Sequence, residues 1–354
     1  MPLSKIQFGN TGRRNIIING AMQIAQRATS STGLGSASGY FTLDRFYMVE
    51  NDASDGRFTM SQSAVTDLEG FSNALKIDCT TADTSIAAGE ALILQQNIEG
   101  FNVQQLKSTS TTTKAITLSF YAKSNASRAI ASELRFSNGT NRQASKLHTI
   151  GTSWARYTFT VPAASSIQID NDNSNEMQVN LWLHGGTTFT SGTLSSTFEA
   201  SNNANRAAGI GSIFASTDNE IEITGIQLEV GDSPTEFEHR LLGEELSLCQ
   251  RYFKRIEVGN NIRMNTSAFA DTTSRARFVI YHNPKMRSTP TVAETNLDLA
   301  DASGNVDIDA IATVGSTDLN DVIITRSAGS HTAGDILQVH TGGNTAKLDF
   351  IAEL

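Results

Sequence analysis

The densest group of potential metal ligands is the acidic segment 170–176, which is Asp-Asn-Asp-Asn-Ser-Asn-Glu. Side-chain oxygens at alternate positions of an extended loop suit Ca²⁺, because every second side chain points toward the ion. A helix–loop–helix calcium loop would need a glycine at its sixth position and a bidentate glutamate at its twelfth. This chain has Asn175 and Leu181 there. We therefore predict a solvated loop between strands and no metal site.

Two tryptophans are the candidates for contact with a sugar. Trp154 and Trp182 each occupy the parity opposite the apolar face of their expected strand. An outward-facing indole can stack on the C–H face of a sugar ring, and this predicts Trp154 and Trp182 as glycan-binding residues. The alternative is that each ring packs against protein, for example beneath a neighbouring chain of an assembly.

The other reactive residue types lack the spacing that catalysis requires. The carboxylates form no motif that fixes an acid–base pair at the separation needed for glycoside hydrolysis. The glycines at Gly33 and Gly35 lie in a linker and are not followed by the third glycine of a dinucleotide fingerprint, and no serine nucleophile elbow is present. We therefore predict a protein that is not an enzyme and has no cofactor. The histidines also lack metal-ligand spacing; they are His148, His184, His239, His282, His331 and His340.

Composition narrows the classes of partner. The 354 residues carry a formal net charge of −9 and no cluster of Lys or Arg, which argues against a nucleic-acid partner. No apolar run approaches the length of a membrane span, and the first ten residues lack a secretory signal. Two cysteines, Cys79 and Cys249, are too few for a disulfide framework.

Alternation with period two dominates residues 40–240. Several segments carry apolar residues at every second position, without helical patterns between them, and this predicts an antiparallel sandwich of the jelly-roll type. An N-terminal strand and a Ser/Thr/Gly-rich linker precede it over residues 1–39. The clearest alternating runs are Ile116–Ala122, Trp154–Val161 and Val179–Leu183.

The last strand of this sandwich contains one break in parity. Ile221 and Ile223 set one parity, whereas Ile226 and Leu228 set the other, with Gly225 between them. One extra residue at a glycine is typical of a β-bulge, which would turn both halves of the strand toward one core.

Helical spacing replaces alternation over residues 241–256. Leu242, Leu246 and Phe253 lie on one apolar line of an expected connector helix. Such a wide apolar stripe is unlikely to stay solvated, so we predict these three residues at an assembly interface, in a trimer. Alternation returns in residues 257–354, which predicts a smaller C-terminal β domain. The predicted fold class is therefore all-β, with one short helix between a jelly roll and a second β domain.

Three separated segments resemble structural proteins of tailed bacteriophages, particularly tail-fibre and appendage proteins. The first is Asn15-Ile-Ile-Ile-Asn-Gly with Gln26-Arg27, followed by Tyr40-Phe-Thr-Leu-Asp-Arg-Phe46. The second is Ile223-Thr-Gly-Ile-Gln-Leu-Glu-Val-Gly231 with Phe237-Glu-His-Arg240. The third is Glu245-Leu-Ser-Leu-Cys-Gln-Arg-Tyr-Phe253 with the Pro284–Thr291 element. In such proteins these elements open and close a jelly roll like that of carbohydrate-binding modules and connect it to the next domain.

The resemblance implies a virion protein that contacts other tail or capsid proteins and, through its jelly roll, a host-surface polysaccharide. The short segment before the opening strand favours a compact tail appendage over a complete fibre. Two alternatives stay open. The chain could be another virion protein, a capsid decoration or head-fibre protein, or it could be an enzyme, a glycan depolymerase. A cell-encoded lectin is disfavoured because no secretory signal is present.

Overall fold

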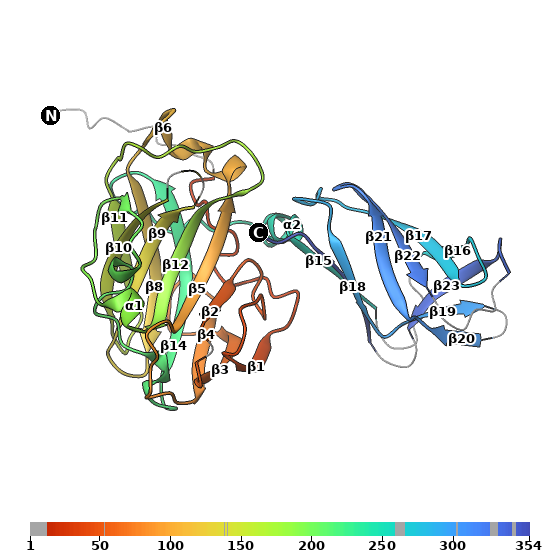
Figure 1. Ribbon diagram of the computed structural model, residues 1–354, viewed down its shortest axis with the longest axis horizontal. Helices are drawn as coiled ribbons and strands as arrows, with labels where there is room; N and C mark the ends of the chain where they lie inside the picture. The colour runs from red at the N-terminus through yellow and green to blue at the C-terminus, as the bar shows by residue number, and fades with distance from the viewer. Residues whose placement is uncertain are drawn as a thin grey trace. The chain divides into compact units, whose positions relative to one another are not determined.

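The computed structural model describes residues 13–52, 54–137, 139, 141–258, 266–301, 304–325, 332–341 and 345–354. The chain divides into a first compact unit that ends at Leu242 and a second unit from Gly243 to Glu353 (Figure 1). Antiparallel strands dominate both units, which confirms the predicted all-β class. No described helix is long and apolar enough to cross a membrane.

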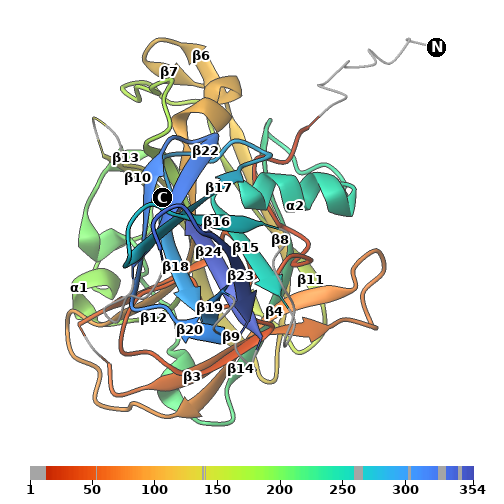
Figure 2. The same cartoon turned by 90° about the vertical axis from the view of Figure 1, so that its right-hand side faces the viewer.

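The first unit is a sandwich of two six-stranded sheets, whose strands run side by side in Figures 1 and 2. The first sheet, in spatial order, contains β1 (Ser30–Leu34), β3 (Arg57–Ala64), β4 (Asn73–Thr81), β14 (Glu220–Val230), β8 (Ile116–Ser124) and β11 (Ala155–Val161). The second sheet contains β13 (Glu199–Ala200), β10 (Arg142–Ile150), β9 (Arg128–Phe136), β12 (Asn175–Gly185), β5 (Ala91–Glu99) and β2 (Tyr47–Asn51).

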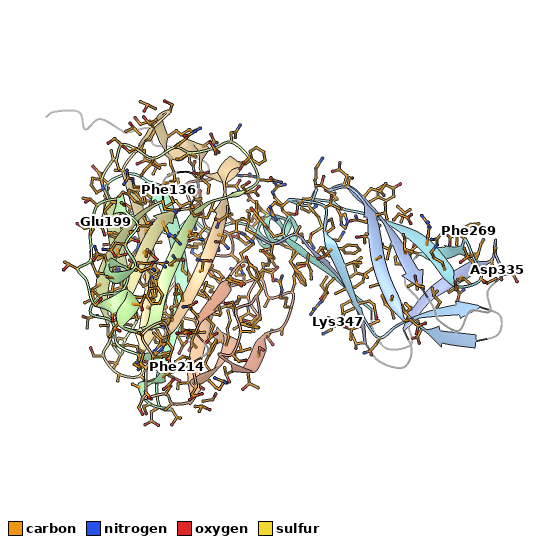
Figure 3. All side chains as sticks on the ribbon, in the orientation of Figure 1. Phe136, Glu199, Phe214, Phe269, Asp335 and Lys347 are labelled. Carbon is orange, nitrogen blue, oxygen red and sulfur yellow. The ribbon has the colours of Figure 1, made fainter. Side chains whose placement is uncertain are left out.

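One apolar core fills the space between these sheets. Leu118 and Phe120 of β8 face it from the first sheet, and Leu181 of β12 faces it from the second. Because side chains alternate along a strand, each strand then presents its other residues on the outside of the sandwich. Phe136 and Phe214 lie toward opposite ends of this core (Figure 3).

The predicted bulge in β14 is confirmed. The register of β14 against β8 shifts between Thr224 and Gln227, and Gly225 has a φ of 59°. A Cβ atom on Gly225 would lie 2.7 Å from Cζ of Phe71 and 2.8 Å from Cδ2 of Tyr121. Glycine is therefore required both for the backbone conformation and for the approach of the two rings. Both halves of the strand supply core residues, as the sequence indicated.

The first two of the three segments quoted above contact each other in the first unit. Asn15 donates through Nδ2 to the carbonyl of Ile226 at 3.1 Å, and its Oδ1 accepts from the backbone N–H of Leu228 at 3.1 Å. Arg240 donates through Nη1 to the carbonyl of Ile17 at 2.9 Å. The opening segment is thus fastened to the closing strand by side-chain hydrogen bonds, because only specific polar groups at these positions satisfy both backbones.

The second unit packs a three-stranded sheet and a seven-stranded sheet around a core that includes Phe278, Val322 and Phe350. The three-stranded sheet contains β15 (Phe253–Val258), β24 (Ala346–Ile351) and β18 (Thr291–Thr295). The seven-stranded sheet contains β20 (Gly304–Asp307), β19 (Leu297–Asp301), β23 (Ile336–Thr341), β16 (Ser267–Ala270), β17 (Arg275–Tyr281), β22 (Leu319–Thr325) and β21 (Ala310–Gly315).

The connector helix is shorter than predicted. Helix α2 spans Leu242–Gln250, and Phe253 is the first residue of β15, where it pairs with Ile351. Helical spacing in the sequence extended past the helix because apolar residues of the following strand fall at the same intervals. The remaining short elements are β6 (Lys107–Thr109), β7 (Thr112–Thr113), α1 (Thr187–Thr190) and the 3₁₀ turns η1 (Gly100–Asn102), η2 (Gln104–Leu106), η3 (Asn203–Asn205) and η4 (Ile213–Ala215).

Candidate functional site

The outer face of the second sheet, which is turned away from the sandwich core, carries side chains in register across neighbouring strands. In one row Arg135 of β9 and Asn97 of β5 flank Gln178 of β12. Hydrogen-bonding side chains at matching positions of adjacent strands lie close together on one face. The alternation of each strand therefore places a row of polar side chains on this face, in which Asn97 is buried and Arg135 and Gln178 are partly exposed.

A second row lies beside the first and is built around Glu133. In this row Asn180 of β12 lies between Glu133 of β9 and Gln95 of β5, and Tyr47 of β2 pairs with Gln95. Tyr47 is half-buried, and its ring centroid lies 4.8 Å from that of Tyr40. The outer face thus combines amide groups with an aromatic ring at its β2 edge.

Glu133 holds the centre of this face in place. Its Oε2 accepts from Nδ2 of Asn180 at 2.8 Å and from Nε1 of Trp182 at 3.0 Å. Arg206 donates from Nε to Oε1 at 2.8 Å and from Nη2 to Oε2 at 3.0 Å. Asn180 in turn accepts from Nε2 of Gln95 at 2.9 Å. A buried carboxylate with a bidentate arginine and amide donors is satisfied, so these side chains are fixed in one arrangement.

Arg135 lies on the same face and, unlike Arg206, is not paired with a carboxylate of a described residue. It forms no ion pair with any described residue, and its Nε has no hydrogen-bond partner there. Burial lowers the pKa of Arg135, the nearby charge of Arg206 lowers it further, and Glu133 opposes both. The adjacent Gln178 likewise leaves its Oε1 without a partner among the described residues. Both atoms are themselves shielded from solvent, although each residue is partly exposed, so pairing with a polar ligand requires these two side chains to move.

Trp182 lies on the outer face, as its parity predicted, but its ring is fully buried. The segment after β12 crosses this part of the sheet and places Phe189 at 5.1 Å from the indole and the Arg206 guanidinium at 4.7 Å. The ring is therefore covered by its own chain, which corresponds to the packing alternative. A sugar could not stack on Trp182 unless Arg206 and Phe189 moved.

Trp154 lies outside the other sheet and stays half-buried. Its Nε1 donates to Oδ1 of Asp67 at 2.8 Å, and Nζ of Lys123 lies 4.9 Å from the ring centroid. The hydrogen bond from Trp154, followed by that from Lys123, lowers the pKa of Asp67. The two tryptophans are thus on opposite sheets and do not contribute to one site.

The three predicted interface residues occupy different environments. Leu242, the first residue of α2, is 59% exposed, and Leu246 is half-buried. Phe253 is only 1% exposed and is the first residue of β15. Phe253 is therefore buried and is not available to a neighbouring chain, a correction that follows from the early end of the helix.

A serine, a histidine and a glutamate form a hydrogen-bonded chain at the end of the second sheet. His184 Nδ1 lies 2.7 Å from Oγ of Ser212, and its Nε2 lies 3.0 Å from Oε2 of Glu90. This order of groups occurs in acyl-transfer enzymes. Here, however, the Ser212 oxygen caps η4 by accepting from the N–H of Phe214, and burial lowers the pKa of His184. These hydrogen bonds of His184 and Ser212 therefore hold η4 against β12.

The acidic segment 170–176 ends the connection from β11 to β12, and its last two residues begin β12. Oδ1 of Asp172 accepts from the N–H of Ser174 at 2.9 Å, which is the hydrogen bond of a local turn. Among the described residues, no three His, Cys, Asp or Glu side chains gather where they could hold a metal ion.

Comparisons with known proteins give matches in solved structures alone: no protein-family model matches the chain, and no curated protein does. The enzymatically active domain of tailspike protein 4 from bacteriophage CBA120 is 14% identical, with a TM-score of 0.31, over 61% of this chain and 21% of that chain. A family 61 carbohydrate-binding module in complex with β-1,4-galactotriose is 9% identical, with a TM-score of 0.30, over 62% and 99% of the two chains. A family 11 module of a Clostridium thermocellum cellulase is 11% identical, with a TM-score of 0.28, over 60% and 99%.

Proposed function

We propose that the chain is a structural protein of a tailed-bacteriophage virion, a tail appendage, and that its first unit binds a host-surface saccharide on the outer face of the second sheet. The observation that carries the binding proposal is the pair of polar rows around Gln178 and Asn180. Saccharides present hydroxyl groups that both donate and accept hydrogen bonds, so they are bound by amide and guanidinium groups whose positions are already fixed.

Within this face each residue has a different part in binding. When their side chains turn toward the ligand, Arg135 supplies an Nε–H donor and Gln178 an Oε1 acceptor that no described residue uses. Tyr47 offers the side of an aromatic ring at the edge of the same face, where a sugar C–H surface can pack. Glu133 and Arg206 position the neighbouring amides and are themselves satisfied by each other.

The virion part of the proposal is supported by the three sequence segments that resemble phage structural proteins. Two of them meet through the hydrogen bonds of Asn15 with the backbone of Ile226 and Leu228. Asn15 therefore joins the first and last segments of the sandwich, so these two motifs belong to a single folding unit. The ordered set therefore supports one common module more strongly than three separate matches would.

Binding of bacterial surface polysaccharides to the purified full chain tests the saccharide part. A glycan array identifies a bound saccharide, and titration calorimetry measures its affinity. Arg135→Gln should weaken binding roughly ten- to hundredfold, since hydrogen bonds from a charged group contribute about 1.5 to 3 kcal/mol. The variant should not lower the melting temperature, because it removes a partly buried charge that has no carboxylate partner.

The matched control is Arg142→Gln, which changes an arginine of the neighbouring strand β10 that donates to the carbonyl of Ser166. It should leave the affinity unchanged. Equal loss of affinity in both arginine variants, or loss only in Trp154→Ala, would contradict the assigned face. If the protein released reducing sugar from the polysaccharide that it binds, its function would be that of a depolymerase and not of a binding protein. Cryo-electron microscopy of particles tests the virion part separately, and density for this chain at the capsid instead of the tail would favour a decoration protein.

A further inference from the structure

The outer face of the seven-stranded sheet in the second unit carries exposed apolar side chains, with paired charges between them. It carries large hydrophobic side chains that are between 45% and 76% exposed, although the inner face of the same strands forms the core of the unit. Soluble single chains rarely expose a continuous apolar patch of this kind without a partner. The exposed side chains are Ile336 of β23, Phe269 of β16, Val279 and Tyr281 of β17 and Val314 of β21. Phe269 is labelled in Figure 3.

Strand register makes these residues one continuous surface. Phe269 pairs with Ile336 on one side and with Arg277 on the other. Val279 and Val314 each pair with Asp321 of β22, which lies between them. Adjacent strands are about 4.8 Å apart, so paired side chains on one face touch or nearly touch. The patch therefore extends across β23, β16, β17, β22 and β21.

The charges within this patch are balanced and paired with one another. Arg277 donates from Nε to Oδ2 of Asp271 at 2.7 Å and from Nη1 to Oδ2 of Asp321 at 2.9 Å. Arg275 also pairs with Asp271. Two arginines and two aspartates give the patch no net charge. Covering it leaves no charge without a counter-ion, whereas a strongly charged partner would find no excess of opposite charge.

We propose that this face packs against the same face of other copies of this chain, so that the second units associate around a symmetry axis. A surface that packs on itself needs balanced charge and apolar area, and this face has both. The five strands of the patch, spaced about 4.8 Å apart and each about six residues long at about 3.3 Å per residue, offer on the order of 500 Å². A stable interface buries roughly 800 Å² per partner, so this face supplies more than half of one such interface. The inference does not depend on saccharide binding by the first unit.

The mass of the full-length chain in solution tests this assignment. Multi-angle light scattering and native mass spectrometry should give a multiple of the chain mass at micromolar concentration. The double variant F269T/V279K should shift the mass to that of a single chain, because it introduces a hydroxyl and an unpaired charge into the patch. Circular dichroism and melting temperature should stay unchanged, since both positions are exposed and Thr suits a strand.

Two further variants test whether the loss of association is specific to this face. Tyr281→Lys changes a different row of the same face and should also release single chains. Phe101→Thr replaces an equally exposed phenylalanine of the first unit and should leave the assembly intact. The proposal is overturned if the unaltered chain is monomeric, or if folded F269T/V279K and Tyr281→Lys keep the oligomeric mass. Capture of another virion protein by a monomeric chain through this face would assign the surface to that protein instead.

Discussion

Trp182 and Glu133 lie on neighbouring strands of the second sheet and are joined by a hydrogen bond of 3.0 Å from the indole Nε1 to the carboxylate Oε2. Both side chains are fully buried although they point away from the sandwich core. The reason is Arg206, which covers the indole and pairs with the carboxylate. An outward-facing tryptophan has thus become part of the support for the polar rows beside it.

Glu133→Gln should destabilise the first unit by about 2 to 4 kcal/mol. Glutamine can still accept hydrogen bonds from Asn180 and Trp182, but it leaves the mostly buried guanidinium of Arg206 without a charged partner. Denaturant unfolding followed by tryptophan fluorescence measures the change. Glu69→Gln, at an exposed position, is the control and should have no effect. Equal stability of the two variants would mean that the Glu133–Arg206 pair contributes little.

Gly225→Ala should lower the free energy of unfolding by about 1 to 3 kcal/mol. Its φ of 59° disfavours any Cβ, and the Cβ would also press on Phe71 and Tyr121. Gly33→Ala separates these two causes, because Gly33 has a φ of 72° and no atom within 4 Å of the added carbon. If alanine lowers the free energy of unfolding equally at both positions, then the backbone conformation alone explains why glycine is required at position 225, and the contact with the two rings adds nothing.

Buried His148 should make stability depend on pH. Burial, with a smaller effect of Lys146, lowers the pKa of His148 to about 4, and its Nε2 lies 2.8 Å from Oγ of Ser132. In the unfolded chain the pKa is about 6.5, so between about pH 6.5 and 4 only the unfolded chain takes up this proton. The free energy of unfolding should therefore fall by about 3 kcal/mol over that interval as the pH falls, and this contribution should be constant above and below it.

His148→Gln provides the comparison, since glutamine cannot titrate and can still bond to Ser132. The difference in stability between the unaltered chain and this variant should change by about 3 kcal/mol between about pH 7.5 and pH 4. Comparing differences is necessary because burial also lowers the pKa of His184 and His282. Parallel stability curves for the two proteins would show that His148 is protonated as readily in the folded state as in the unfolded one.

The sequence predicted what depends on local pattern. Alternation placed Leu118 and Leu181 in the core, and the parity break placed the bulge at Gly225. The burial of Trp182 could not be predicted in this way, because Phe189 and Arg206 come from an irregular segment whose path over the sheet has no period. The polar rows of the second sheet could not be predicted from local pattern either.

Those rows depend on the register between strands that are distant in sequence. Gln95, Glu133 and Asn180 become neighbours only when β5, β9 and β12 pair at particular residues. Their outward parity was a signal present in the sequence. Asn180 is flanked by two apolar core residues, and Gln95 and Glu133 each adjoin one, Leu94 and Leu134. Parity, however, does not say which outward residues of different strands meet, and strand pairing is set by the whole fold.

Leu242→Asp and Phe253→Ala should separate assembly from folding at the connector. Leu242 is exposed at the first position of α2, where an aspartate is favourable near the helix N-terminus, so this variant should fold normally. If α2 contributes to an interface, then light scattering should show weaker association. Phe253→Ala should instead lower the free energy of unfolding by about 3 to 5 kcal/mol, because it removes a buried aromatic ring. Ser247→Asp, at an exposed position of the same helix, controls for added charge. Unchanged association of folded Leu242→Asp would leave the seven-stranded sheet, and not the helix, as the surface through which chains meet.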